Sequence, residues 1–223
     1  MSPAPVPVPS PIKPAGRIRQ KNESAIIAAA EVEFARHGYK GTSMNSIAQA
    51  VGLPKANLHY YFNSKLGLYV AVLNNILDQW DTTFSNLSVD DDPAQALSRY
   101  IRTKIEYSRT QPLASRIFAM EVISGGQYLT AHYNQDYREW FRQRAGVFQA
   151  WIDAGKMEPI DPVHLIFLLW GSTQHYADFA SQICLLTGQS SLKKADFAKA
   201  ADTLEHIILK GCGLTPPKRD AAD

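Results

Sequence analysis

The amino-acid sequence predicts an all-α fold. Apolar residues recur at helical spacing in almost every segment, whereas no segment shows the sustained apolar–polar alternation of a half-buried strand. Two segments also open with the same helix-start signal, an aspartate followed by a proline, at Asp92-Pro93 and Asp161-Pro162. These observations together favour a chain built of successive helices.

The N-terminal part predicts three helices. Residues 1–16 hold six of the 13 prolines, so we expect a disordered tail there and a first domain over residues 17–64. Its first helix stops at Gly38, a second short helix runs from a cap at Thr42 or Ser43 to Gly52, and a third starts near Pro54 and reaches about Phe62.

The remaining helices predict a larger domain over residues 65–214, followed by a disordered tail at 215–223. Asn63 or Ser64 caps a long fourth helix, and Asp92 caps the next. "PLASRIFAMEVIS" and "YREWFRQRAGVFQAWIDAG" follow as two further helices. We expect one long helix from Asp161 to Gly188 and a last one that opens at Ser190 or Ser191.

Composition excludes several classes of protein. Of the 223 residues, 45% are hydrophobic, yet no apolar run reaches the roughly 18 residues of a membrane span. Prolines interrupt the apolar start, so it does not read as a signal peptide. Cys184 and Cys212 form neither a disulfide framework nor a zinc spacing, which favours a cytoplasmic protein without a metal.

The second and third helices, joined by a turn that contains glycine, predict a helix-turn-helix. In this motif the second helix enters the major groove of DNA. Asn57 can pair with adenine. Tyrosine and histidine side chains can contact phosphates, and a helix N-terminus can bind a phosphate. An ordinary helical turn with core tyrosines is the alternative. The candidate DNA-binding residues are Thr42, Ser43, Lys55, Ala56, Asn57, His59, Tyr60, Tyr61 and Lys65.

Charge is distributed unevenly along the chain. Up to Lys65 there are eight Lys/Arg and three Asp/Glu, or 8 − 3 = +5; the remaining 15 and 18 give 15 − 18 = −3. Positive charge at the helix-turn-helix end favours a polyanionic partner for that end, although a solvated surface would look similar.

The stretch "AIIAAAEVEFARHGYKGTSMNSIAQAVGLPKANLHYYFNSK" resembles the DNA-binding head of the TetR family of regulators. Glu31 and Glu33 depart from the family pattern, which usually has Leu there, and His59 stands where another aromatic residue is common. The matching residues are Phe34, Gly38, Tyr39, Thr42, Ile47, Ala48, Gly52, Lys55, Tyr60, Phe62, Ser64 and Lys65.

Two later stretches, "ASRIFAMEVISG" and "PIDPVHLIFLLWGSTQHYADFASQI", resemble a narrower branch of that family, the regulators of pyrimidine utilisation. The resemblance implies a homodimeric transcription factor that binds double-stranded operator DNA and senses uracil or thymine, and it implies no cofactor.

The segment "WGSTQHYADF" places polar residues on an otherwise apolar helix, where they must find partners. A planar pyrimidine would need aromatic walls and an amide that both donates and accepts. Tying helices together or meeting across a dimer interface would explain the same residues. The candidates are Trp80, Phe118, Trp170 and Tyr176 for the walls and Ser172, Thr173 and Gln174 for the edge.

The last two helices are apolar enough to form a four-helix bundle with a second copy. The expected dimer interface includes Phe179, Phe197, Ala201, Leu204 and Ile208.

Other functions have weaker support. The six histidines are scattered, and the sequence lacks His-Glu-x-x-His, Gly-x-Ser-x-Gly and a phosphate-binding glycine loop, which disfavours an enzyme or a metal protein. A TetR-like regulator of another inducer, such as a hydrophobic drug, is the nearer alternative. The polar "GSTQ" segment argues against a purely apolar pocket.

Overall fold

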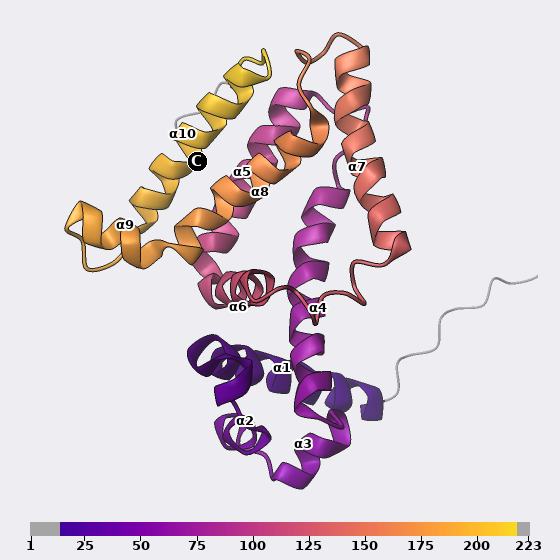
Figure 1. Ribbon diagram of the computed structural model, residues 1–223, viewed down its shortest axis with the longest axis vertical. Helices are drawn as coiled ribbons and strands as arrows, with labels where there is room; N and C mark the ends of the chain where they lie inside the picture. The colour runs from indigo at the N-terminus through magenta and orange to yellow at the C-terminus, as the bar shows by residue number, and fades with distance from the viewer. Residues whose placement is uncertain (1–13, 218–223) are drawn as a thin grey trace, which may run out of the picture. The chain divides into compact units, whose positions relative to one another are not determined.

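The computed structural model describes residues 14–217, and every regular element in that range is a helix, as predicted (Figure 1). No helix in this range is long and apolar enough to cross a membrane. The elements are α1 (Pro14–Gly41), α2 (Met44–Val51), α3 (Lys55–Tyr61), α4 (Lys65–Ser85), α5 (Pro93–Thr110), α6 (Pro112–Ile123), α7 (Gln135–Asp153), α8 (Pro162–Asp178), α9 (Ala180–Thr187) and α10 (Lys194–Gly211).

The chain divides into two compact units, one up to Val72 and one from Leu73. The boundary lies inside α4 rather than at its start. Tyr69 of α4 is buried, and its ring meets that of Phe34 with 4.8 Å between the centroids. The first two turns of α4 therefore belong to the core of the first unit.

The start of α1 differs from the prediction. The helix begins at Pro14, so residues 14–16 of the expected disordered tail are helical; proline is accepted in the first turn of a helix. Residues 1–13 of that tail, and 218–223 of the other, lie outside the described residues. Gly38 breaks the helix as predicted, with φ 66° and ψ 174°, and one short turn follows it to Gly41.

Several predicted caps are present. The Ser64 hydroxyl accepts a hydrogen bond from the Gly67 N–H at 3.0 Å at the start of α4. Asp92 and Asp161 accept from the backbone N–H groups of Gln95 and His164 at 2.9 and 3.0 Å. Each cap satisfies a backbone donor that has no partner inside the helix.

The C-terminal helices differ from the prediction in two places. The helix expected from Asp161 to Gly188 is broken at Phe179, where φ is −113° and ψ is 23°, although neither proline nor glycine signals a break there. The last helix starts at Lys194 instead of Ser190 or Ser191. The Asp196 carboxylate accepts from the Lys193 N–H at 2.8 Å and so sets a later start.

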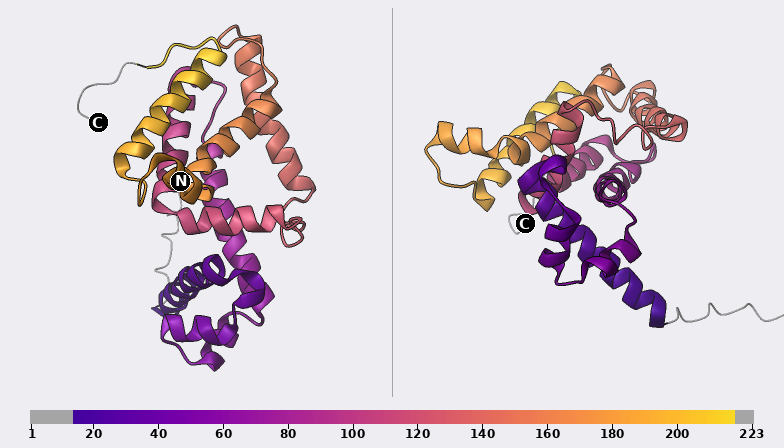
Figure 2. Two further views of the ribbon diagram at one scale, coloured as in Figure 1. Left: turned by 60° about the vertical axis from the view of Figure 1, so that its left-hand side comes forward. Right: turned by 60° about the horizontal axis from the view of Figure 1, so that its bottom comes forward.

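The second unit is organised around α5, which packs against α8 and α10. Figures 1 and 2 show these three helices side by side in different views. Large side chains such as Phe84, Phe148 and Trp151 fill the core between them and α7.

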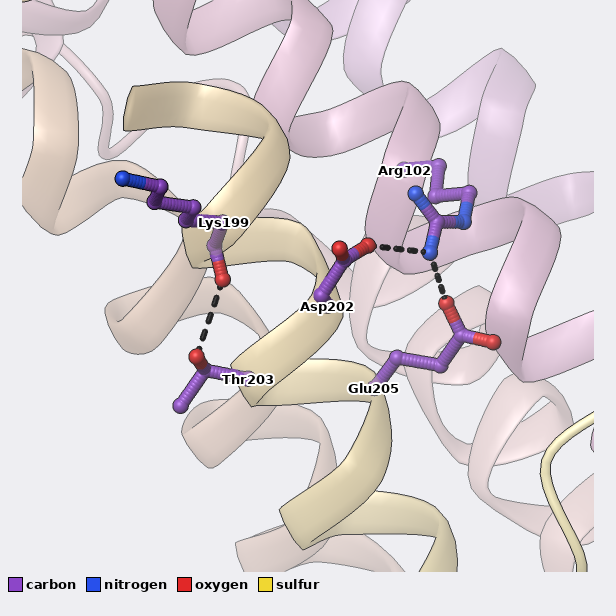
Figure 3. A network of polar contacts seen from close by, with 5 residues as sticks. All are labelled: Arg102, Lys199, Asp202, Thr203 and Glu205. Atoms are coloured by element: carbon purple, nitrogen blue, oxygen red, sulfur yellow. Dashed lines mark hydrogen bonds and ion pairs between the residues drawn. The ribbon is translucent and has the colours of Figure 1, made fainter. Parts of the chain in front are cut away.

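A charged contact joins α5 to α10 inside this packing (Figure 3). The Arg102 guanidinium donates to Asp202 Oδ1 at 2.9 Å and also to Glu205 Oε2. The Glu205 side chain is almost fully buried, whereas Arg102 and Asp202 reach the surface. Because burying an unpaired carboxylate costs free energy, the ion pair with Arg102 compensates for the burial of Glu205 on α10.

Replacing the glycine that ends α2 with any other residue should strain the backbone. Gly52 has φ 70° and ψ 29°, a left-handed conformation that costs other residues energy, although a Cβ would meet nothing there. Gly52→Ala should lower the free energy of unfolding by about 1 kcal/mol. Gly146→Ala is the matched control, since Gly146 lies inside α7 with equally open space, and alanine should raise stability by about 0.5–1 kcal/mol. Urea unfolding at one protein concentration measures both changes, and equal effects would contradict the strain argument.

Candidate nucleic-acid interface and effector cavity

The helix-turn-helix consists of α2, a turn at residues 52–54 and α3. Ser43 caps α2 through a reciprocal arrangement with Ser46: Ser43 Oγ accepts from the Ser46 N–H at 3.0 Å, and Ser46 Oγ accepts from the Ser43 N–H at 3.2 Å. Leu58 is fully buried and anchors α3, whose opposite side is solvent-exposed.

Most of the predicted DNA-binding residues lie on that exposed side of α3, where Tyr60 is 70% exposed. The Arg19 guanidinium of α1 lies 5.9 Å from the centre of the Tyr60 ring and brings a positive charge beside it. Tyr61 is half-buried, and its hydroxyl accepts a hydrogen bond from Asn22 Nδ2 at 2.9 Å, so it ties α3 to α1. The exposed members are Lys55, Ala56, Asn57, His59 and Tyr60.

Two predicted DNA-binding residues make contacts inside the first unit. Thr42 is buried, and its hydroxyl donates to the Glu33 carbonyl at 3.0 Å. The Lys65 ammonium donates to the carbonyls of Tyr39 and Thr42 at 2.8 and 2.9 Å and lies 4.6 Å from the Tyr39 ring centre. These contacts join α4 to the end of α1 and give both side chains a structural role.

A cavity of about 30 Å³ lies in the second unit. Trp80, Phe118, Trp170 and Gln174, four of the seven residues predicted from sequence to bind a ligand, line it. The Trp80 and Phe118 rings meet edge to face with their centroids 5.1 Å apart. The other lining residues are Leu77, Asp81, Phe84, Tyr100, Lys104, Tyr133 and Tyr137.

One buried and one half-buried ionisable side chain line the same cavity. Lys104 is only 3% exposed, and its ammonium lies 4.0 Å from the centre of the Trp80 ring. Burial lowers the pKa of Lys104 to about 7, and burial raises the pKa of Asp81 to about 6. The Tyr137 hydroxyl donates to Asp81 Oδ1 at 3.1 Å. The cavity is therefore an aromatic enclosure with a cation and an anion in its wall.

Phe118 and Gln174 also line a second, more open groove of about 360 Å³ between α6 and α8. The groove is otherwise mostly apolar, with Met120, Ile123 and Phe179 among its residues. Phe118 and Gln174 are therefore shared by the two spaces.

The other three predicted ligand-binding residues line neither space. Ser172 and Thr173 donate their hydroxyls to carbonyls one turn earlier in α8, and the Thr173 carbonyl accepts from Ser108 Oγ at 2.8 Å. The Tyr176 ring packs near Phe197 of α10. The alternative considered for such residues, that they tie helices together, fits Thr173 and Tyr176, whereas the Ser172 hydroxyl bonds within α8 itself.

Five polar residues of the cavity were not predicted from the sequence. For one of them, Lys104, the sequence carries a signal that could have identified it. Lys104 interrupts an apolar stripe of α5 in which Leu97, Tyr100 and Ile101 precede it at helical spacing. A charge inside such a stripe signals either a partner or a site. The residues not selected are Asp81, Tyr100, Lys104, Tyr133 and Tyr137.

The expected dimer residues are mostly internal. Phe197, Ala201 and Ile208 are buried in the core of their own chain and Leu204 packs against it, so only Phe179 offers an exposed ring. A helical apolar stripe indicates burial but not whether the chain's own core or a second copy covers it. The exposed apolar side chains of α8 and α10 are Val163, Phe167, Leu168 and Ile207.

Two family models match the chain. Residues 26–72 match "Bacterial regulatory proteins, tetR family", and residues 73–215 match "YcdC-like protein, C-terminal region". The chain belongs to the TetR family. As a TetR-family protein it is a DNA-binding transcriptional regulator and not an enzyme, which confirms the resemblance of its N-terminal region.

Individual relatives agree with this assignment. The HTH-type transcriptional regulator RutR of Escherichia coli O157:H7 is 40% identical over 189 residues, which cover 85% of this chain and 89% of RutR. The HTH-type transcriptional repressor NicS of Pseudomonas putida is 29% identical over 132 residues, or 59% of this chain and 61% of NicS. A TetR-like transcriptional regulator from Rhodococcus sp. RHA1 has the same fold with a TM-score of 0.62 at 18% identity, covering 85% and 94% of the two chains.

Proposed function

We propose that this TetR-family regulator is a cytoplasmic repressor that binds a partly palindromic operator as a homodimer and leaves it when a pyrimidine such as uracil or thymine binds. The observation that carries the proposal is the aromatic cavity with buried polar groups, in a chain 40% identical to RutR. The resemblance of its α6 and α8 sequences to regulators of pyrimidine utilisation supports the same effector.

The cavity chemistry suits a pyrimidine. Such a ring is flat and carries N–H donors and carbonyl acceptors on its rim. Trp80, Phe118 and Trp170 supply flat apolar walls, and the Gln174 amide can donate and accept at once. At about 30 Å³ the cavity holds little more than a water molecule, so a pyrimidine must displace side chains. That displacement is the proposed signal.

The α4 helix is the proposed route for the signal. It carries Lys65, which bonds to the end of α1 and to Thr42 just before α2, and Trp80, which lines the cavity. Fifteen helical residues span about 22 Å, so a small tilt at one end becomes a displacement at the other. Two heads in successive major grooves, about 34–36 Å apart, tolerate little change in separation.

Pyrimidine and operator should oppose each other. Millimolar uracil or thymine should weaken operator binding about a hundredfold, or about 2.7 kcal/mol, and operator must weaken pyrimidine binding by the same factor. Fluorescence anisotropy of an operator fragment measures this. Gln174→Ala should lose most of the response, whereas Gln149→Ala, on the surface of α7, should keep it. An unchanged wild-type affinity would sink the pyrimidine proposal, and release by a hydrophobic amphiphile instead would establish the alternative inducer.

Base reading is proposed for α3. Asn57 is exposed near its start and can pair bidentately with adenine, while the Tyr60 hydroxyl suits a phosphate. Asn57→Ala should remove about 1–3 kcal/mol of discrimination at one or two base pairs. Tyr60→Phe should weaken all sequences alike by about 1 kcal/mol. Selection from a randomised operator library reads out both, and an unchanged sequence profile in Asn57→Ala would refute its role.

The proposed dimer joins α8 and α10 of two copies in a four-helix bundle. The exposed apolar residues replace the buried ones as its centre, with Leu168 on α8 and Ile207 on α10, 52% and 59% exposed. Leu168→Glu should raise the dimer dissociation constant at least about a hundredfold, because an unpaired carboxylate would be buried. Val89→Glu, an equally exposed apolar position outside the bundle, is the control. Light scattering would contradict the interface if Leu168→Glu stayed dimeric or if wild type were a monomer at micromolar concentration.

A further inference from the structure

The two charges in the effector cavity are not paired with each other. Lys104 projects from α5 and Asp81 from α4, and both line the cavity. Within residues 14–217 no ion pair joins them: the ring that faces Asp81 is the imidazole of His132, whose Nε2 lies 3.8 Å from Asp81 Oδ2. Opposite charges that line one cavity without pairing can each contact a third group that enters the cavity.

Lys104 lacks a hydrogen-bond acceptor in the described part of the chain. Its ammonium has three donors, and the Trp80 ring face at 4.0 Å attracts the charge without accepting a conventional hydrogen bond. Asp81 and Asp178 stabilise the charge through space only. Because a buried cation with unused donors is costly, the site is complete only when an acceptor atom enters it.

Asp81 is held in place by its own neighbours. The Tyr137 hydroxyl donates to Oδ1, and His132 faces Oδ2. A carboxylate offers about four acceptor positions, so one donor from Tyr137 leaves capacity for another. A ligand N–H at the cavity wall would use it.

Resting on the function proposed above, we propose that Lys104 and Asp81 recognise the effector as a cyclic amide, Lys104 donating to a ring carbonyl oxygen and Asp81 accepting from a ring N–H. One positive and one negative group suit a neutral ligand that carries both a donor and an acceptor. Asp81 repels a carboxylate, and Lys104 repels an amine. A zwitterion would bring two more full charges out of water between flat aromatic walls, at a high desolvation cost.

Recognition by these two charges makes effector binding depend on pH. Burial lowers the pKa of Lys104 to about 7 from an ordinary 10.5, and a ligand that needs the cation loses affinity as pH rises above that value. Burial raises the pKa of Asp81 to about 6 from 3.8, and a ligand that needs the carboxylate loses affinity as pH falls below it. Affinity should therefore be highest between about pH 6 and 7.

Several other titratable groups surround the pair. Asp178 of α8 hydrogen-bonds Ser115 Oγ at 2.5 Å, and burial raises its pKa. His132 contacts the Asp81 carboxylate directly, so it needs its own variant. The remaining groups around the pair are Asp78, Tyr100, Arg116, Tyr133, Tyr137 and His175.

The test is calorimetric titration of uracil into the full-length protein from pH 5 to 8.5. Lys104→Met keeps the length of the side chain. It should lower the affinity for uracil at least a hundredfold near pH 6.5 and abolish the loss of affinity above about pH 7. Asp81→Asn should abolish the loss of uracil affinity below about pH 6, whereas His132→Gln should retain it. Lys156→Met and Asp90→Asn, both exposed, are the matched controls. In wild type, 1,3-dimethyluracil, which keeps both carbonyls but has no N–H, should bind at least a hundredfold more weakly than uracil.

The outcomes separate this inference from the proposed function. If no pyrimidine binds wild type or releases it from operator, the proposed function fails. If wild type responds to uracil but Lys104→Met binds it equally well with the same pH profile, the function stands and the two-charge recognition is wrong. Equal binding of dimethyluracil, or tighter binding of phenylalanine as a zwitterion probe, would also overturn it. Operator binding by each variant reports whether it is folded.

Discussion

Buried polar groups must find partners, and this constraint organises the second unit. Glu205 is buried on α10 because Arg102 of α5 reaches it. Ser108 of α5 donates to the Thr173 carbonyl of α8, and Ser115 of α6 donates to Asp178. Each bond satisfies a group that the core would otherwise penalise by about 1–3 kcal/mol, and each fixes one helix against another. The apolar residues provide most of the burial, and these polar contacts add specific bonds between the helices.

Lys104 is the exception, and the proposed effector site rests on it. It is as buried as its apolar neighbours, yet among the described residues only an aromatic face and distant carboxylates stabilise it. The proposed recognition of a ligand carbonyl gives a reason for this lysine, since a methionine of similar length would pack at a lower desolvation cost.

In the first unit, too, polar atoms that are withdrawn from water have hydrogen-bond partners. Lys65, Thr42 and Tyr61 use their polar atoms to hold α1, α3 and α4 together. The outer side of α3, with Asn57 and Tyr60, is left exposed and free for another molecule. The predicted DNA-binding residues thus divide into those that hold the first unit together and those that it presents to solvent.

The sequence by itself determined the helical class, most helix boundaries and the helix-turn-helix, because caps, glycines and apolar periodicity are local signals. It also led to Trp80, Phe118, Trp170 and Gln174, since aromatic and amide groups on apolar helices are visible in one dimension. Only the tertiary structure decided which buried side chains share a cavity: it added Asp81 and Lys104 from two different helices and left out Ser172, Thr173 and Tyr176. It also decided that Phe197, Ala201 and Ile208 face their own core. The physical reason is the same in both cases: helical periodicity shows that a side chain is covered, but which atoms cover it depends on helices distant in sequence.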